Sequence, residues 1–213
     1  MKLDSLIERL AEDLAPVRPR RFWVDASIIA LIAALELPLL FAVGNAQPGM
    51  RRMLTEPTMG WRLGSLGLIA LVSGFLAIRS FYPTYSAQRP LRWLTLIIAI
   101  CVAYGMVMAG SPASVASVIH RLNWPSGVDC AFKIVLLSIP PLIGLAVLGR
   151  SGAPTDLRRT PLLIGVAAAA WGAFVFVFDC PFDDPLYILV WYGLGCGIVM
   201  LLARLLLPRF VRW

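Results

Sequence analysis

Two Asp-Cys pairs, Asp129-Cys130 and Asp179-Cys180, are the residues of this chain best suited to chemistry. Two cysteines can form a reversible disulfide when their Cα atoms lie about 4.4–6.8 Å apart. Thiolates and neighbouring carboxylates can instead hold a soft or borderline metal ion. Further metal ligands would come from three side chains: His120, Asp183 and Asp184. The pattern therefore predicts a thiol or redox sensor or a metal site, and a static disulfide or two inert thiols is the third interpretation.

The segments that must position these pairs are two apolar stretches, 131–148 and 161–178, each of 18 residues. A helix of that length is about 27 Å long, which matches a bilayer core. A short polar turn, 149–160, joins them, and each cysteine lies 25 residues from Thr155 in that turn. Equal distances from the turn of an antiparallel hairpin mean equal depth. We therefore expect Cys130 and Cys180 to meet at one membrane surface.

The composition places the whole chain in the membrane class. Hydrophobic residues make up 59% of the 213 residues and charged residues 15%, and such long apolar runs exceed what a soluble core needs. Backbone groups in lipid must be bonded within their own segment, which predicts an all-α fold. We expect a tail, 1–22, and a six-helix transmembrane domain, 23–213. The six expected spans are 24–43, 62–78, 91–109, 131–148, 161–178 and 186–207.

The distribution of Lys and Arg predicts the orientation. With six spans both termini share a side, and 14 of the 19 basic residues fall on that side. The other side holds five: Arg51, Arg52, Arg62, Arg121 and Lys133. The positive-inside rule then places both termini in the cytoplasm. The cysteine pair would face an oxidising compartment, where disulfides persist. The net charge of +7 is read as a topology signal, and direct binding of nucleic acid is not expected.

The first 15 residues have the pattern of a short amphipathic helix. The apolar residues that gather on one face are Leu3, Leu6, Ile7, Leu10 and Leu14. Such a helix can lie on lipid. However, four acids precede Pro16 against two basic residues, and an anionic leaflet repels an acidic helix. An apolar stripe flanked by acids favours a groove on a basic protein partner.

Glu36 is the one acid deep inside an expected span. Intramembrane acids are candidates for function, but we favour a structural bond to Arg62 or Lys133. Pro140-Pro141 predicts a kink in the 131–148 segment. Three further expectations concern packing: Trp191 at the membrane interface, close helix approach at Gly193, Gly195 and Gly197, and Cys101 and Cys196 as buried apolar residues mid-span.

Several short motifs together resemble the NrsF family of bacterial inner-membrane anti-sigma factors. They are Leu6-Ile7-Glu8-Arg9-Leu10, Leu14-Ala15-Pro16-Val17-Arg18-Pro19, Gly127-Val128-Asp129-Cys130, Gly152-Ala153-Pro154 and Cys180-Pro181 followed by Asp183-Asp184-Pro185-Leu186-Tyr187 and Trp191. The resemblance covers the whole chain. Relatives often carry a His after this tryptophan, where the present chain has Tyr192, which argues against a metal site.

The resemblance implies that the tail holds an extracytoplasmic-function (ECF) sigma factor inactive. It also implies that Cys130 and Cys180 take part in sensing metal or oxidative stress, with Asp129 and Asp179 as supporting residues. We therefore predict a multi-pass anti-sigma factor of the inner membrane with a role in a stress response. It would be no enzyme and have no resident cofactor, a transient metal ion at Cys130 and Cys180 being the one exception.

The alternative class is a small transporter or a membrane thiol oxidoreductase. The chain has no CxxC motif, which disfavours a thioredoxin-like oxidoreductase. Deletion of the tail separates the two classes, because only a regulator would lose its function.

Overall fold

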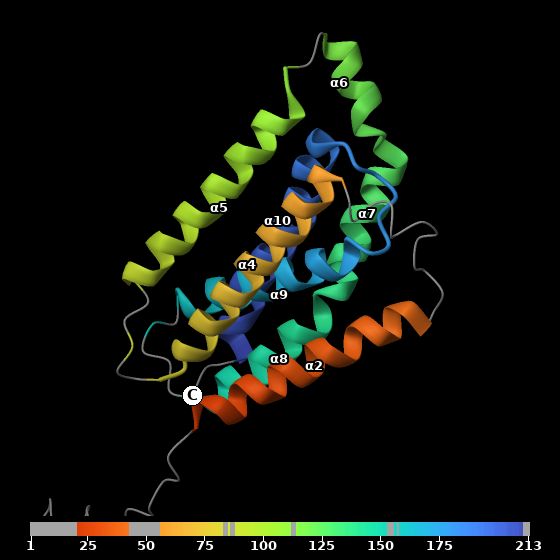
Figure 1. Cartoon of the computed structure of the whole chain (residues 1–213). Coiled ribbons are helices and arrows are strands. Elements are labelled where there is room, and N and C mark those ends of the chain that lie inside the picture. The colour runs from red at the N-terminus through yellow and green to blue at the C-terminus, as the bar shows by residue number, and fades with distance from the viewer. Residues whose placement is uncertain are drawn as a thin grey trace, which may run out of the picture.

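The computed structural model describes residues 21–42, 56–82, 85, 88–111, 114–152, 156 and 158–210, and their regular secondary structure is entirely helical. The helices are α2 (Phe22–Ala42), α4 (Pro57–Arg79), α5 (Gln88–Ala109), α6 (Val115–Leu122), α7 (Trp124–Leu137), α8 (Ile139–Arg150), α9 (Thr160–Phe176) and α10 (Pro185–Phe210) (Figure 1). The all-α fold class is thus confirmed for this part of the chain. The apolar face of the tail, formed by Leu3, Leu6, Ile7, Leu10 and Leu14, lies outside the described residues.

Among the described residues, five helical stretches are long and apolar enough to cross a membrane, and α7 and α8 together form one of them, Trp124–Arg150. The expected 161–178 span is a shorter apolar helix, α9, of 17 residues. That length sits at the lower limit of about 17 residues for a spanning helix. The structure therefore supports a membrane protein with five long spans, while the sixth rests on how α9 is counted.

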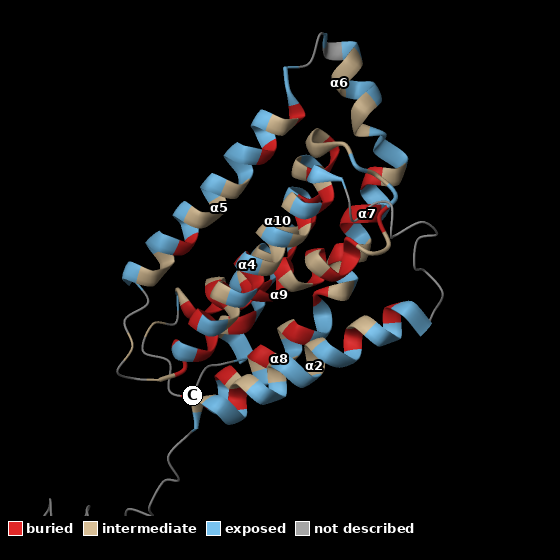
Figure 2. Ribbon diagram, in the orientation of Figure 1, coloured by how far each residue is buried: buried red, intermediate tan, exposed pale blue. Residues whose placement is uncertain are grey.

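Helix α9 is the centre of the bundle, because residues on all its sides are buried (Figure 2). It packs against α4, α7, α8 and α10. Its middle is a run of small residues, 167–170, all alanine. A helix that is apolar all round belongs in a core, and small side chains let neighbouring backbones approach closely. Because α9 is packed on all sides, it fixes the position of the loop that follows it.

The expected kink near Pro140-Pro141 is confirmed as a break between two helices. Helix α7 ends at Leu137, Ser138 interrupts it, and α8 begins with prolines in its first turn. Gly172 of α9 faces this break so closely that a Cβ there would lie 2.2 Å from Ser138 Oγ and 2.7 Å from Ser138 N. The break is therefore built against the centre of α9.

Two details of the packing around α7 were not predicted from the sequence. Helix α7 begins at Trp124 rather than near residue 131, so Cys130 lies inside the helix. Trp191 is buried within the protein, and its Nε1 donates to the carbonyl of Leu122 at 2.7 Å. Its indole occupies the space that a side chain at Gly127 would need, since a Cβ there would lie 1.9 Å from the ring.

The glycines of α10 divide into two kinds. A Cβ at Gly195 would meet Ile134 Cβ at 3.1 Å and the carbonyl of Ala131 at 3.2 Å, so the expected close approach to α7 is present there. A Cβ at Gly193 or Gly197 would meet no atom within 4 Å, so close packing does not explain these two glycines.

We expect Gly172→Ala to destabilise the bundle by about 1–3 kcal/mol, because the added methyl group overlaps the backbone at Ser138. The measurement is thermal unfolding of the purified protein in detergent. Gly74→Ala on α4 is the matched control, since a Cβ there meets nothing within 4 Å. Equal unfolding temperatures for the two variants would contradict this description of the break.

Candidate functional site

Cys130 and Cys180 lie together in one buried cluster at the end of α9. Cys130 sits on α7, and Cys180 follows α9 in the loop 177–184. They share an apolar cluster with Tyr187, Trp191 and Tyr192 of α10. Their residues are 3% and 0% exposed, and both thiols are free. Both thiols lie in the same apolar cluster and each shifts the pKa of the other, so the two are close enough to act as one unit.

Local structure fixes each sulfur. The backbone N–H of Cys180 donates to the carbonyl of Phe176 at 3.1 Å, which continues the last turn of α9 to the cysteine. Its Sγ lies 3.9 Å from the carbonyl of Phe182. Cys130 Sγ lies 3.1 Å from Tyr187 Oη. Because three separate elements contribute these contacts, the pair is held by the tertiary fold rather than by a local motif.

Arg62 of α4 holds the loop that carries Cys180. This arginine is 1% exposed. Its Nη1 donates to the carbonyl of Phe182 at 2.9 Å and lies 3.4 Å from Asp183 Oδ1. Its Nη2 donates to Tyr192 Oη at 2.6 Å. This role of Arg62 was not predicted from the sequence. The signal that could have indicated it is an arginine within an apolar span, on a helix with no acid in its first turn to pair with it.

The surroundings favour the ionised form of Cys180. Its pKa is lowered, first by the hydrogen bond from Cys130 and then by the charge of Arg62, and these effects outweigh burial, which acts in the opposite direction. The thiolate is the nucleophilic form of cysteine. The site therefore combines a thiol of lowered pKa, a second thiol beside it and a fixed positive charge.

The carboxylates near the thiols are engaged by basic side chains. Lys133 Nζ lies 3.3 Å from Asp129 Oδ2 and 3.1 Å from Asp179 Oδ2. Arg121 Nε donates to Asp184 Oδ2 at 2.7 Å. Burial alone would raise the pKa of Asp184, but the bonds from Arg121 and from the backbone of Leu186 lower it overall. These aspartates therefore form structural ion pairs with Lys133 and Arg121.

The expected metal-ligand set is not assembled among the described residues. They contain no group of three or more His, Cys, Asp or Glu side chains placed to hold a metal ion. His120 is exposed on α6, apart from the thiol cluster. The donor set at Cys130 and Cys180 thus fits thiol chemistry better than metal coordination.

The expected bond from Glu36 to Arg62 or Lys133 was wrong. Glu36 Oε2 accepts a hydrogen bond from Trp171 Nε1 at 2.9 Å. Both basic residues are used at the thiol site instead. Glu36 Oε1 is buried and has no hydrogen-bond partner within the described part of the chain. The acid therefore links α2 to the central helix α9.

A bundle of long apolar helices that encloses a thiol pair defines a polytopic helical membrane protein with a buried cysteine site. The model of the NrsF family, negative regulator of sigma F, matches residues 10–213. The chain belongs to this family, whose name describes an anti-sigma factor and implies a sigma factor as partner. Neither the curated proteins nor the solved structures include a significant match to the chain.

We expect the thiolate of Cys180 to persist to lower pH than that of an ordinary cysteine, whose pKa is about 8.5. The measurement is thiolate absorbance at 240 nm against pH in a Cys101→Ala, Cys196→Ala background. Adding Cys130→Ala removes the largest cause of the shift and should move the midpoint to higher pH. A midpoint that stays in place would show that Cys130 does not stabilise the thiolate.

Proposed function

We propose that this chain is an anti-sigma factor of the bacterial inner membrane whose tail, residues 1–22, sequesters an ECF sigma factor through Leu3, Leu6, Ile7, Leu10 and Leu14. Oxidation of Cys130 and Cys180 to a disulfide releases the sigma factor in a stress response. The protein acts as a regulator without a catalytic role of its own and needs no resident cofactor. The observation that carries the sensing part is that the two free thiols are buried in one cluster beside Arg62.

The chemistry of the site favours oxidation over metal capture as the signal. A thiolate next to a thiol is the arrangement from which a disulfide forms once an oxidant removes two electrons. Asp129 and Asp179, the expected supporting ligands, are paired with Lys133. Their role is then to hold the ends of α7 and α9 together, with a transient metal ion at Cys130 and Cys180 as the alternative.

The fold offers a route from the site to the opposite membrane surface. Disulfide formation removes the thiolate that faces Arg62 and the thiol that contacts Tyr187, which changes the contacts of the loop 177–184 and of α10. Helix α10 runs for 26 residues from this loop to Phe210, and Ser138, between α7 and α8, is the position at which we expect the fourth span to bend. A coupling of about 1–3 kcal/mol changes partner affinity roughly 5- to 150-fold.

The proposed topology has six spans, with α9 as the short fifth and both termini in the cytoplasm. The support is the placement of 14 of 19 basic residues on one side. The thiol pair then lies near the periplasmic surface, and the signal crosses the bilayer to reach the tail.

A membrane thiol oxidoreductase is the second candidate, because the lowered pKa of Cys180 is also what such an enzyme needs. A small transporter is the remaining alternative. Both would keep their function when the tail is deleted, whereas the proposed regulator would not.

Replacing Leu6 and Leu10 together by Ala should raise transcription from the target promoter, because each lost apolar contact at an interface costs on the order of 1–3 kcal/mol. A pull-down of the sigma factor with full-length protein measures the contact directly. Glu12→Ala is the control, since Glu12 falls on the opposite face of the predicted helix. Intact repression in the double variant would refute this face as the contact.

Cys130→Ser, Cys180→Ser and the double variant should share one phenotype, loss of the response to oxidants with the protein still in the membrane. The reason is that a disulfide needs both sulfurs. Promoter activity against oxidant dose is the measurement, and Cys101→Ser serves as the control. A normal dose response in the double variant would place sensing elsewhere, with Glu36 the next residue to test.

Reporter fusions at Thr155 and at Phe182 should report opposite compartments, cytoplasm for the first and periplasm for the second. These positions flank α9, so opposite signals would mean that this 17-residue helix spans the membrane. Signals from the same compartment at both positions would contradict the six-span topology.

A further inference from the structure

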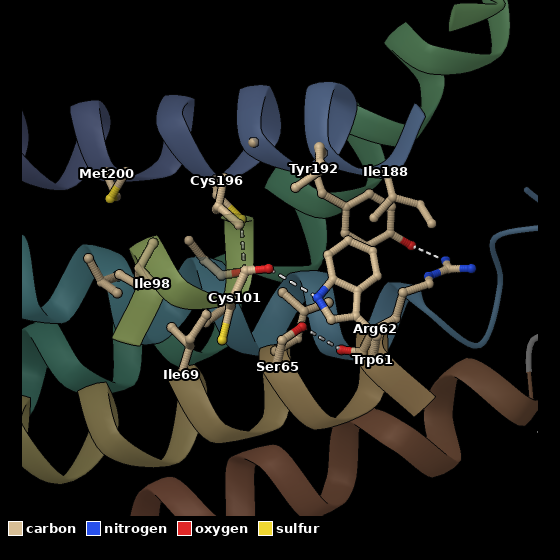
Figure 3. Close-up of a pocket in the computed structure, with 17 residues that line it drawn as sticks. Trp61, Arg62, Ser65, Ile69, Ile98, Cys101, Ile188, Tyr192, Cys196 and Met200 are labelled. Carbon is tan, nitrogen blue, oxygen red and sulfur yellow. Dashed lines mark hydrogen bonds between the residues drawn. The ribbon is translucent and has the colours of Figure 1, made fainter. Parts of the chain in front are cut away.

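A cavity of about 510 Å³ lies where α2 begins and α4 ends. The described residues that line it are Phe22, Trp23, Phe75, Arg79, Tyr82 and Tyr85. It is separate from an apolar cavity of about 220 Å³ between α4, α5, α9 and α10, to which α4 contributes earlier residues such as Trp61 and Ser65 (Figure 3). The two cavities share no described residue, so the one beside Arg79 is a site of its own.

This cavity lies at the level of a membrane surface. Helices α2 and α4 are both long and apolar enough to span a bilayer, and the start of α2 lies beside the end of α4 (Figure 1). The rings of Phe22 and Phe75 join the two ends, with centroids 5.4 Å apart. Trp23 is 79% exposed and Phe75 46% exposed, and aromatic rings at span ends face the lipid interface. The cavity therefore opens at the boundary between headgroups and acyl chains.

Arg79 supplies the positive charge of this cavity, and none of the described lining residues is acidic. Its Cζ lies 5.4 Å from the ring centroid of Phe22 and 5.0 Å from that of Phe75. Such cation–π contacts engage the charge of a guanidinium but not its N–H donors. Among the described residues, no acceptor bonds to these donors. The two rings thus hold the guanidinium in place and leave its donors available to a ligand.

The ligand that suits these walls is an anion with an apolar body. A planar guanidinium matches the oxygens of a phosphate group and can bind them in a bidentate manner. Tyr85 adds a hydroxyl donor. Burial raises the pKa of Tyr85 and the charge of Arg79 opposes this, which places the two side chains near each other. The exposed rings of Trp23 and Phe75 offer an apolar surface, which a soluble phosphate would leave unused.

We propose that this cavity binds one anionic phospholipid, with its phosphate group at Arg79 and its acyl chains along the lipid-facing side of α2 and α4. Basic pockets between membrane helices on the cytoplasmic side bind such headgroups, and the proposed topology places this end of the bundle there. The bound lipid would fix the point at which the tail joins α2, because Phe22 lines the cavity and directly follows that tail. The inference is independent of the thiol chemistry at Cys130 and Cys180.

The test is native mass spectrometry of the full-length protein in a non-ionic detergent, titrated with phosphatidylglycerol. We expect one phosphatidylglycerol to bind that phosphatidylcholine with the same acyl chains does not displace. Arg79→Gln should weaken this binding by about tenfold or more, because it removes the charge-assisted contact to the phosphate. Arg92→Gln is the matched control, since Arg92 is exposed near the start of α5 and lies outside the cavity lining.

A second pair of variants tests the apolar wall. Trp23→Ala should weaken the binding severalfold because it removes apolar contact area, and its exposed side chain can be removed without loss of the fold. Trp93→Ala is the control, since Trp93 is 67% exposed on α5 and does not line the cavity. Thermal unfolding of each variant in the same detergent verifies that it is folded.

Three results would overturn the proposal while leaving the proposed thiol sensing intact. Equal effects of Arg79→Gln and Arg92→Gln, or no effect of either, would mean that any lipid is held by general charge attraction. Displacement of the lipid by glycerol phosphate would assign the cavity to a soluble phosphate compound. Displacement by a peptide of residues 1–15 would assign it to the acidic tail of the chain itself.

Discussion

The burial of the Arg62 guanidinium is the constraint on which the end of the bundle around Cys180 depends. Taking a charge out of water costs several kcal/mol unless good partners replace the solvent. The partners come from far along the chain: the carbonyl of Phe182, Asp183 and the hydroxyl of Tyr192. Helix α4 is thereby tied to the loop 177–184 and to α10. The position of Cys180 follows from this tie, and the charge of Arg62 adds to the effect of Cys130 in lowering the pKa of its thiol.

The second constraint is the tight packing around α9. Its alanines and glycines allow α4, α7, α8 and α10 to approach it, and in lipid such packing replaces the hydrophobic effect as the force between helices. The break at Ser138 is pressed against Gly172. The bundle therefore has a dense centre and one discontinuity, and a two-state movement of α7 at that discontinuity is the kind of rearrangement that transmembrane signalling needs.

The sequence could predict the helical class, most span positions and the place where the two cysteines come near each other. These predictions rest on hydropathy and on the equal spacing of the cysteines about Thr155. Both properties follow from the order of residues along the chain alone. The chain belongs to the family that the short motifs indicated, and its matched region spans nearly the whole length.

The side-chain partners could not be predicted. Glu36 pairs with Trp171 rather than with a basic residue, and the bond from the buried Trp191 to the carbonyl of Leu122 had no signal in the sequence. Hydropathy shows that a residue lies in a span but not which way the helix is rotated, and rotation decides each partner. The start of α7 was missed for a related reason: residues 124–130 are too polar to extend an apolar run, although Trp124-Pro125 forms a favourable first turn.

In the proposed mechanism, the redox state of Cys130 and Cys180 controls how tightly the tail binds its sigma factor. The most direct measurement is the affinity of purified sigma factor for the full-length protein in nanodiscs, with the pair reduced and then oxidised. The account predicts tight binding to the reduced protein and a loss of roughly 5- to 150-fold on oxidation, absent in the Cys130→Ser, Cys180→Ser variant. Equal affinities in the two redox states, with the disulfide verified, would contradict it.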